Sequence, residues 1–267
     1  MNSGLVVIKG GGDLASGVAH RLHRAGFALL ITELAQPMVV RRTVAFASAV
    51  QDSEIEVEGV RARCVADASE VARVTAQGEI AVLVDPCAQA VRALNPLAVV
   101  DAIMAKHNLG TTLHDAPIVV ALGPGFTAKV DCHAVIETNR GHNLGRVYYN
   151  GAAEADTDEP APIQGFTHER VLRAPTAGVF RGAVHIGQLV APQTVVGWVE
   201  TLPVSAAIAG VVRGLITDGT RVAVGVKIGD IDPSGTVAHC FTLSDKSRAI
   251  GGGVLEAILH FGVNSER

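Results

Sequence analysis

The sequence lacks the features that would place it in several special classes of protein. No apolar run reaches the about 18 residues of a membrane-spanning helix, and the first residues, MNSG, lack the charged and apolar regions of a signal peptide. The net charge is −4 and the basic residues form no block, so we expect no nucleic-acid partner. The four cysteines form no CxxC pair, which indicates reduced thiols. Together these absences predict a cytoplasmic protein that interacts with neither a membrane nor nucleic acid.

Aromatic residues are also scarce, at 4% of the chain, whereas glycine is abundant, with 29 of 267 residues. A core with few rings is built from small aliphatic side chains, which is typical of α/β packing. Apolar residues make up 48% of the chain, so it can bury a sizeable core and is not disordered. At this length we expect either one large domain or two smaller ones.

The first part of the chain shows the pattern strand, tight turn, helix, strand. The turn reads Gly10-x-Gly12-x-x-Ala15, a form of the dinucleotide-binding fingerprint, and the second apolar run ends at Glu33. In that fingerprint the backbone and the helix amides bind phosphate, and a carboxylate binds a ribose diol. We therefore predict a nucleotide-containing ligand at Gly10, Gly11, Gly12, Asp13, Leu14 and Glu33. A tight turn without a ligand is the alternative.

Two adjacent arginines, Arg41 and Arg42, follow soon after the Glu33 strand. Arginine binds phosphate through two parallel hydrogen bonds, so we predict that this pair neutralises the phosphates of the ligand. A solvated pair, or an ion pair with Glu33, is the alternative interpretation.

Further apolar runs at 80–84, 98–103 and 117–122 predict additional strands. Strands that alternate with crossover segments predict a Rossmann-like, doubly wound parallel sheet, which we place in residues 1–150. Ligands of such sheets bind outside the carboxyl ends of the strands. We expect the glycine turn, Asp85, Asp101 and 123–125 to meet at that edge.

Polar side chains are densest in the segment 131–146, DCHAVIETNRGHNLGR. If 132–138 is a strand, His133 and Glu137 share one face and Cys132 lies on the other. We expect no metal site, since adjacent Cys and His side chains then point in opposite directions. A surface strand and loop with satisfied hydrogen bonds is one interpretation. The sharper prediction is that His133, Glu137, Arg140 and His142 contact the reactive end of the ligand and transfer protons.

An acidic, Pro-rich linker at 151–162 precedes an internal repeat. Residues 172–200 and 204–232 share ten identities in 29 positions, where about two would arise by chance. The repeat predicts a small two-fold symmetric β module, placed at 163–235. It resembles the half-motifs of biotinyl and lipoyl carrier domains, which implies a barrel-sandwich hybrid fold. The hairpin Thr201-Leu202-Pro203 lacks the carriers' lysine, so we expect the module to cover the first domain's site or to pair subunits.

The last segment predicts an amphipathic helix that starts with Ser244 and Asp245 as a cap. Three glycines, 251–253, lie inside it, although a helical glycine costs about 1 kcal/mol relative to alanine. We therefore expect this helix, at 243–262, to pack closely against another helix of the first domain.

Four segments along the whole chain carry a family resemblance: KGGGDLASGVAHRLHRAGF, ELAQPMVVRRTVAF, LGPGF with DCHAVIETNRGHNLGR, and SDKSRAIGGGVLEAIL. In this order they resemble the YqeB-type maturation proteins of the selenium-dependent molybdenum hydroxylase system. The resemblance implies an accessory role, with a xanthine dehydrogenase-like molybdenum hydroxylase or its accessory proteins as partner. It carries over no catalytic residue.

Three hypotheses follow. The first is a maturation factor that binds a pterin dinucleotide or another nucleotide-containing cofactor and passes it to a molybdenum hydroxylase. The second is an NAD(P)-dependent oxidoreductase, and the third is a non-catalytic scaffold. We favour the first because no further dehydrogenase motif accompanies the glycine turn. The sequence decides neither whether the chain is an enzyme nor whether it forms a homo-oligomer.

Overall fold

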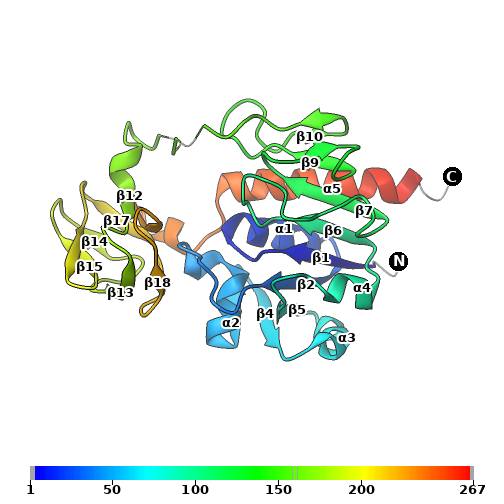
Figure 1. Cartoon of the computed structure of the whole chain (residues 1–267), viewed down its shortest axis with the longest axis horizontal. Helices are drawn as coiled ribbons and strands as arrows, with labels where there is room; N and C mark the ends of the chain where they lie inside the picture. The colour runs from blue at the N-terminus through cyan, green and yellow to red at the C-terminus, as the bar shows by residue number, and fades with distance from the viewer. Residues whose placement is uncertain (1–3, 158, 161, 265–267) are drawn as a thin grey trace. The chain divides into compact units, whose positions relative to one another are not determined.

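The computed structural model describes residues 4–157, 159–160 and 162–264, and these form two compact units. The first unit comprises the described residues of 4–37, 45–157 and 243–264, and it combines a large sheet with helices (Figure 1). The second unit comprises 38–44 and the described residues between 159 and 242, and it consists mainly of β-strands. The chain is thus a mixed α/β protein with a separate β-rich unit.

A mainly parallel sheet forms the centre of the first unit, and its nine strands within the described residues follow the order β10-β9-β7-β6-β1-β2-β5-β4-β3. β1 (Leu5–Lys9) lies between β2 (Ala28–Glu33) and β6 (Ala98–Asp101), parallel to both. The strands β2 to β5 thus lie on one side of β1, and the strands from β6 onward lie on its other side, so the strand order reverses between β1 and β6. The other strands are β3 (Glu54–Val57), β4 (Val60–Val65), β5 (Ile80–Val84), β7 (Ile118–Leu122), β9 (Ala134–Ile136) and β10 (Val147–Tyr148), of which β3 and β10 run antiparallel to their neighbours.

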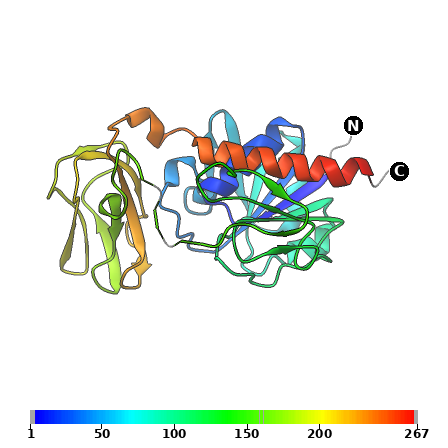
Figure 2. The same ribbon diagram turned by 90° about the horizontal axis from the view of Figure 1, so that it is seen from above.

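Helices cover both faces of this sheet, which explains why its central strands are continuous apolar runs. α1 (Asp13–Arg24) and α5 (Asp245–Asn264) pack against each other, and α5 also contacts β7 and β9 (Figure 2). On the other face, α3 (Val71–Ala76) and α4 (Ala90–Leu94) pack on a cluster that includes Val7 and Leu30. No helix among the described residues is long and apolar enough to cross a membrane.

Short elements complete the first unit. They are α2 (Ala49–Asp52), the 3-10 turns η2 (Phe46–Ser48) and η3 (Ala68–Glu70), and the two-residue strands β8 (Thr127–Ala128) and β11 (Gly151–Ala152). β8 and β11 pair with each other as a separate two-stranded sheet.

Glycines let α5 approach α1 closely. A Cβ added to Gly251 would lie 2.7 Å from the carbonyl oxygen of Gly17, and one added to Gly17 would lie 2.5 Å from Cβ of Ser247. A Cβ added to Gly253 would lie 2.4 Å from the carbonyl oxygen of Gly145, whereas one added to Gly252 would meet nothing within 4 Å. Two of the three consecutive glycines therefore serve close packing.

The second unit contains two four-stranded sheets, in the orders β12-β19-β17-β14 and β16-β15-β13-β18. In sequence order, the internal repeat relates β12, β13, β14 and β15 to β16, β17, β18 and β19, respectively. Exchanging every strand for its repeat partner converts one sheet order into the other, so the repeat is a two-fold relation between the sheets. The strands are β12 (Val171–Arg173), β13 (Gly178–Gly182), β14 (Leu189–Val190), β15 (Val195–Val199), β16 (Leu202–Ser205), β17 (Gly210–Leu215), β18 (Arg221–Val222) and β19 (Lys227–Asp232).

The two sheets of the second unit enclose one apolar core. Its fully buried side chains include Phe180, Val196 and Ile228. Three 3-10 turns also belong to this unit: η1 (Arg42–Val44), η4 (His168–Arg170) and η5 (Val237–Cys240).

We predict opposite stability effects for two neighbouring glycines of α5. Gly251→Ala should lower the free energy of unfolding by about 1–3 kcal/mol, because the new methyl group overpacks the contact with α1. Gly252→Ala should raise it by up to about 1 kcal/mol, because alanine favours the helix and meets no neighbour. Urea denaturation of both variants measures the difference. Equal effects would contradict the close contact at Gly251.

Candidate functional site

The carboxyl ends of the parallel strands bring the predicted site segments to one edge of the sheet. Gly10 to Gly12 follow β1, Asp101 ends β6, Gly123 follows β7 and Glu137 follows β9. Lys9 and Asp101 are direct partners in the parallel pairing of β1 and β6. In doubly wound sheets, ligands bind at this edge where the strand order reverses. Here that place lies between β1 and β6.

The first half of the glycine turn makes its hydrogen bonds to the protein itself. The amide of Gly10 donates to the carbonyl of Thr32 at 2.8 Å, and the amide of Gly11 donates to Oε1 of Glu33, also at 2.8 Å. Ala47 donates its amide to the Gly11 carbonyl at 2.9 Å, and a Cβ on Gly11 would lie 2.9 Å from the Ala47 nitrogen. Gly10 and Gly11 therefore shape a turn that neighbouring segments cover.

The carboxylate of Glu33 makes hydrogen bonds to the backbone of its own turn. Its second oxygen accepts the amide of Leu34 at 2.6 Å, while its first oxygen accepts the amide of Gly11. Both oxygens thus stabilise the backbone next to the turn. The predicted contact with a ribose diol would have to be made by oxygens that already accept hydrogen bonds.

The second half of the turn starts α1 and leaves donors available. Gly12 is the N-cap of α1, in an extended conformation, and no side chain caps this helix end. Within the described part of the chain, the amides of Leu14 and Ala15 donate to no protein acceptor. These amides lie at the positive end of the helix dipole, where an anion is favoured. This part of the fingerprint can therefore contact a phosphate group.

A lysine that the sequence reading did not select lies at the same edge. Lys246 is in the first turn of α5, which the contact of Ser247 with Gly17 places beside α1. Its side chain is half-buried, and among the described residues its ammonium makes no hydrogen bond or ion pair. Burial lowers the pKa of Lys246, and the charge of Arg140 lowers it further. Three carboxylates oppose this shift in pKa: Asp13, Glu137 and Asp156.

Arg140, one of the predicted catalytic residues, holds the start of α5. Its guanidinium donates to both carboxylate oxygens of Asp245, at 2.6 and 2.9 Å, and this pairing raises the pKa of Arg140. Both side chains are exposed at 42% and 71%. Because the bond joins the loop after β9 to the first residue of α5, Arg140 positions the segment that carries Lys246.

Glu137 is fully buried, at 0% exposure, directly after β9. Its two carboxylate oxygens accept the backbone amides of Asn139 at 2.7 Å and Glu154 at 2.8 Å. A buried carboxylate that accepts amides in this way fixes the loop around it. The expected strand with one polar face is wrong here, because β9 spans only Ala134–Ile136 and lies inside the sheet, with both faces covered.

The other two predicted catalytic residues, His133 and His142, and the neighbouring Cys132 have different surroundings. The Nδ1 atom of His133 accepts the amide of Val119 at 2.9 Å, its ring contacts Phe261, and burial lowers its pKa. His142 is an exposed residue of the loop after Glu137. Cys132 is fully buried, and burial raises the pKa of its thiol to about 12, so this cysteine is unsuited to act as a nucleophile.

Arg41 and Arg42 belong to the second unit. Arg41 donates to the carbonyls of His239 and Thr242, at 3.0 and 3.1 Å, and Nε of Arg42 donates to the carbonyl of Leu215 at 2.7 Å. Their guanidinium groups therefore bind backbone of the unit they belong to. Their selection rested on their short distance from Glu33 along the chain, which does not determine the unit in which a residue packs.

The chain has a close relative of known sequence. Over 266 residues it is 53% identical to "Uncharacterized protein YqeB" of Escherichia coli strain K12, and the alignment covers 98% of this chain and 49% of YqeB. The chain therefore spans about half the length of this curated relative. No protein-family model matches the chain.

Comparison with solved structures gives only distant likenesses. An aspartoacylase family protein from Mesorhizobium loti is 15% identical, with a TM-score of 0.27 over 86% of this chain and 85% of that protein. The product-bound ectoine utilization protein EutE (DoeB) from Ruegeria pomeroyi is 10% identical, with a TM-score of 0.24 over 85% of this chain and 56% of that protein. Scores this low establish no common fold.

We predict that Glu137 stabilises the fold. Glu137→Gln should lower the free energy of unfolding by about 1–3 kcal/mol, because an amide group would face one of the two backbone donors. His142→Ala serves as the control, since His142 is exposed and its loss should change stability by less than about 0.5 kcal/mol. Urea denaturation provides the comparison. Unchanged stability of Glu137→Gln would refute the structural role.

Proposed function

Since the chain is a homologue of YqeB over about half of that protein's length, we propose that it binds a nucleotide-containing cofactor and acts as an accessory protein of a molybdenum hydroxylase. The binding part of this proposal is supported by the carboxyl edge of the first unit. The accessory part is what the resemblance of four sequence segments implies.

One observation carries the binding proposal. Among the described residues, the amides of Leu14 and Ala15 at the start of α1 make no hydrogen bond, and Lys246 lies close enough to Asp13, the first residue of α1, to interact with its charge. Six of the seven parallel strands, in the order β5-β2-β1-β6-β7-β9, have an order like that of dinucleotide-binding sheets, which supports this proposal. An anionic phosphate would there meet two backbone donors, a helix dipole and the ammonium of Lys246, which among the described residues makes no hydrogen bond.

The residues present fit the phosphate part of such a cofactor. Leu14 and Ala15 would hold a phosphate oxygen through their amides, and Lys246 would neutralise its charge. Arg140 would act by positioning Lys246 through Asp245. The cofactor itself would supply any redox or transfer chemistry, while the chain binds and orients it.

The oxidoreductase alternative receives less support from the contacts. An NAD site uses a carboxylate for the ribose diol, and each oxygen of Glu33 already accepts one backbone amide, so a diol would have to share these oxygens with the turn. His133, one of the two predicted catalytic histidines, accepts a backbone amide at its Nδ1 atom. A scaffold without a ligand is the remaining alternative.

We predict that Lys246 contributes to the binding of nucleotide phosphates. Lys246→Met should weaken binding of the preferred nucleotide at least about tenfold, because a charge-assisted hydrogen bond is lost. Lys129→Met is the matched control, since Lys129 is an exposed lysine between β8 and β9. Isothermal titration calorimetry with NAD, NADP, ATP, CTP and a molybdopterin dinucleotide ranks the ligands.

The outcomes separate the three hypotheses. Binding of none of these nucleotides would leave only the scaffold. Oxidation of NADH with a carbonyl substrate would favour the oxidoreductase. A pull-down of the tagged chain, followed by metal and selenium analysis of the captured protein, tests the accessory role. Failure to capture a molybdenum enzyme from cells that produce one would contradict it.

A further inference from the structure

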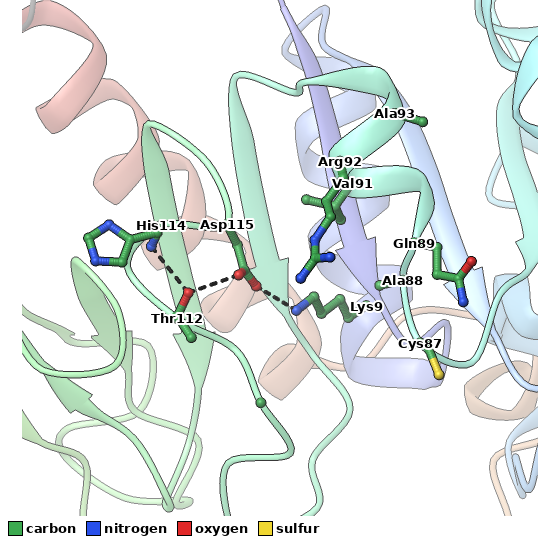
Figure 3. A pocket seen from close by; sticks show the side chains of 11 residues that line it. Lys9, Cys87, Ala88, Gln89, Val91, Arg92, Ala93, Thr112, His114 and Asp115 are labelled. Atoms are coloured by element: carbon green, nitrogen blue, oxygen red, sulfur yellow. Dashed lines mark hydrogen bonds and ion pairs between the residues drawn. The ribbon is translucent and has the colours of Figure 1, made fainter.

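A pocket of about 840 Å³ lies next to the end of β1, between α4 and the loop that follows β6 (Figure 3). A volume of this size is typical of small-molecule sites. The polar residues that line it include Lys9, Arg92, Thr112 and Asp115. None of them belongs to the group of residues around Lys246.

The floor of this pocket is a fixed pair of opposite charges. Nζ of Lys9 donates to Oδ2 of Asp115 at 2.8 Å and to Oγ1 of Thr111 at 2.9 Å. The Thr111 hydroxyl donates to Asp101 at 2.5 Å, and these two residues are 3% and 2% exposed. The buried pair beneath Lys9 thus holds its ammonium in place. The side chains of Lys9 and Asp115 remain 12% and 21% exposed, so a ligand can reach them.

The pair offers a donor and an acceptor side by side. An ammonium has three N–H donors, and Lys9 uses two of them within the protein. The Asp115 oxygens accept from Lys9 and from Thr112, the latter at 3.0 Å, and each can accept a second bond. Because the two charges compensate each other, a simple anion or cation gains little here. A ligand edge with a carbonyl next to N–H groups matches both partners.

The walls of the pocket suit a flat ring. Val91 and Ala88 contribute apolar atoms, and Arg92 extends from α4 into the pocket (Figure 3). Within the described residues the guanidinium of Arg92 makes no hydrogen bond or ion pair, and a planar guanidinium stacks well on aromatic rings. A heterocycle could thus lie between apolar side chains and a cation.

We propose that this pocket binds the 2-amino-4-oxopyrimidine ring that guanine and pterins share. Asp115 accepts the amino and ring N–H groups, and Lys9 donates to the ring carbonyl. The inference rests on the proposed function, because Lys9 directly precedes the turn that leads to the phosphate-binding amides. It adds to that function the class of ring that the cofactor carries.

Calorimetric titration of the full chain with guanosine monophosphate, adenosine monophosphate and pterin tests the proposal. The chain should bind guanosine monophosphate or pterin at least about tenfold more tightly than adenosine monophosphate, which presents an acceptor where guanine presents a ring N–H. Preference for guanosine monophosphate identifies a nucleotide as the source of the ring, and preference for pterin identifies a pterin. Equal binding of all three, or binding of none, would overturn the proposal.

A substitution at Asp115 tests whether the preference for the guanine or pterin ring arises in this pocket. Asp115→Asn should reduce the preference over adenosine monophosphate at least about tenfold, since an amide donor would then face a ring donor. Asp218→Asn, the same change at an exposed aspartate of the second unit, should leave it intact. Retained preference in a folded Asp115→Asn variant would remove the pocket from the mechanism. The wild-type titrations decide the case if that variant does not fold.

The pocket and the phosphate site can fail independently. Lys246→Met should weaken the binding of both mononucleotides without changing the ratio of their affinities. It should leave pterin binding unchanged, because pterin carries no phosphate. One outcome would refute the proposed phosphate site alone: Asp115→Asn weakens pterin binding, while Lys246→Met changes the binding of neither pterin nor the mononucleotides. If Lys246→Met weakens mononucleotide binding and Asp115→Asn leaves the ring preference unchanged, the pocket alone is refuted.

Discussion

The close contact between α1 and α5 is the constraint on which the candidate site depends. A side chain at Gly17 or Gly251 would separate the two helices, because its Cβ would lie 2.5 Å from Ser247 in the first case and 2.7 Å from the Gly17 carbonyl oxygen in the second. With that contact in place, the last helix of the chain starts beside the first helix, at the carboxyl edge of the sheet. Lys246 and the α1 amides then lie in one region, although more than two hundred residues separate them in the sequence.

The hydrogen bonds at this edge divide the polar residues into those that maintain the backbone and those that remain available. Glu33, Glu137 and His133 accept backbone amides, and Arg140 binds Asp245. These groups satisfy donors that burial or a helix start would otherwise leave unbound. Lys246, the first amides of α1 and the Lys9–Asp115 pair retain capacity for a ligand. The chemistry we propose follows from this remaining capacity.

The second unit shows how a repeat becomes a structure. Each half of about 30 residues supplies strands to both sheets, so neither half closes a core alone. The side chains at the core then come from both halves, including Phe180 from the first and Val212 from the second. Its two arginines near the start of the chain, Arg41 and Arg42, bind carbonyls of this unit and so join an early segment to it.

The sequence alone determined the elements whose signal is local. Apolar runs located β1, β2, β5, β6 and β7, the glycine turn located the start of α1, and the repeat located the paired strands of the second unit. The tertiary structure decided the role of each polar side chain, because a carboxylate or guanidinium can bind any donor or acceptor that the fold brings near it. Glu33 was selected from the fingerprint and binds its own turn. Lys246 stood within a segment noted for its glycines, and only the packing of α5 on α1 places its ammonium at the edge of the sheet.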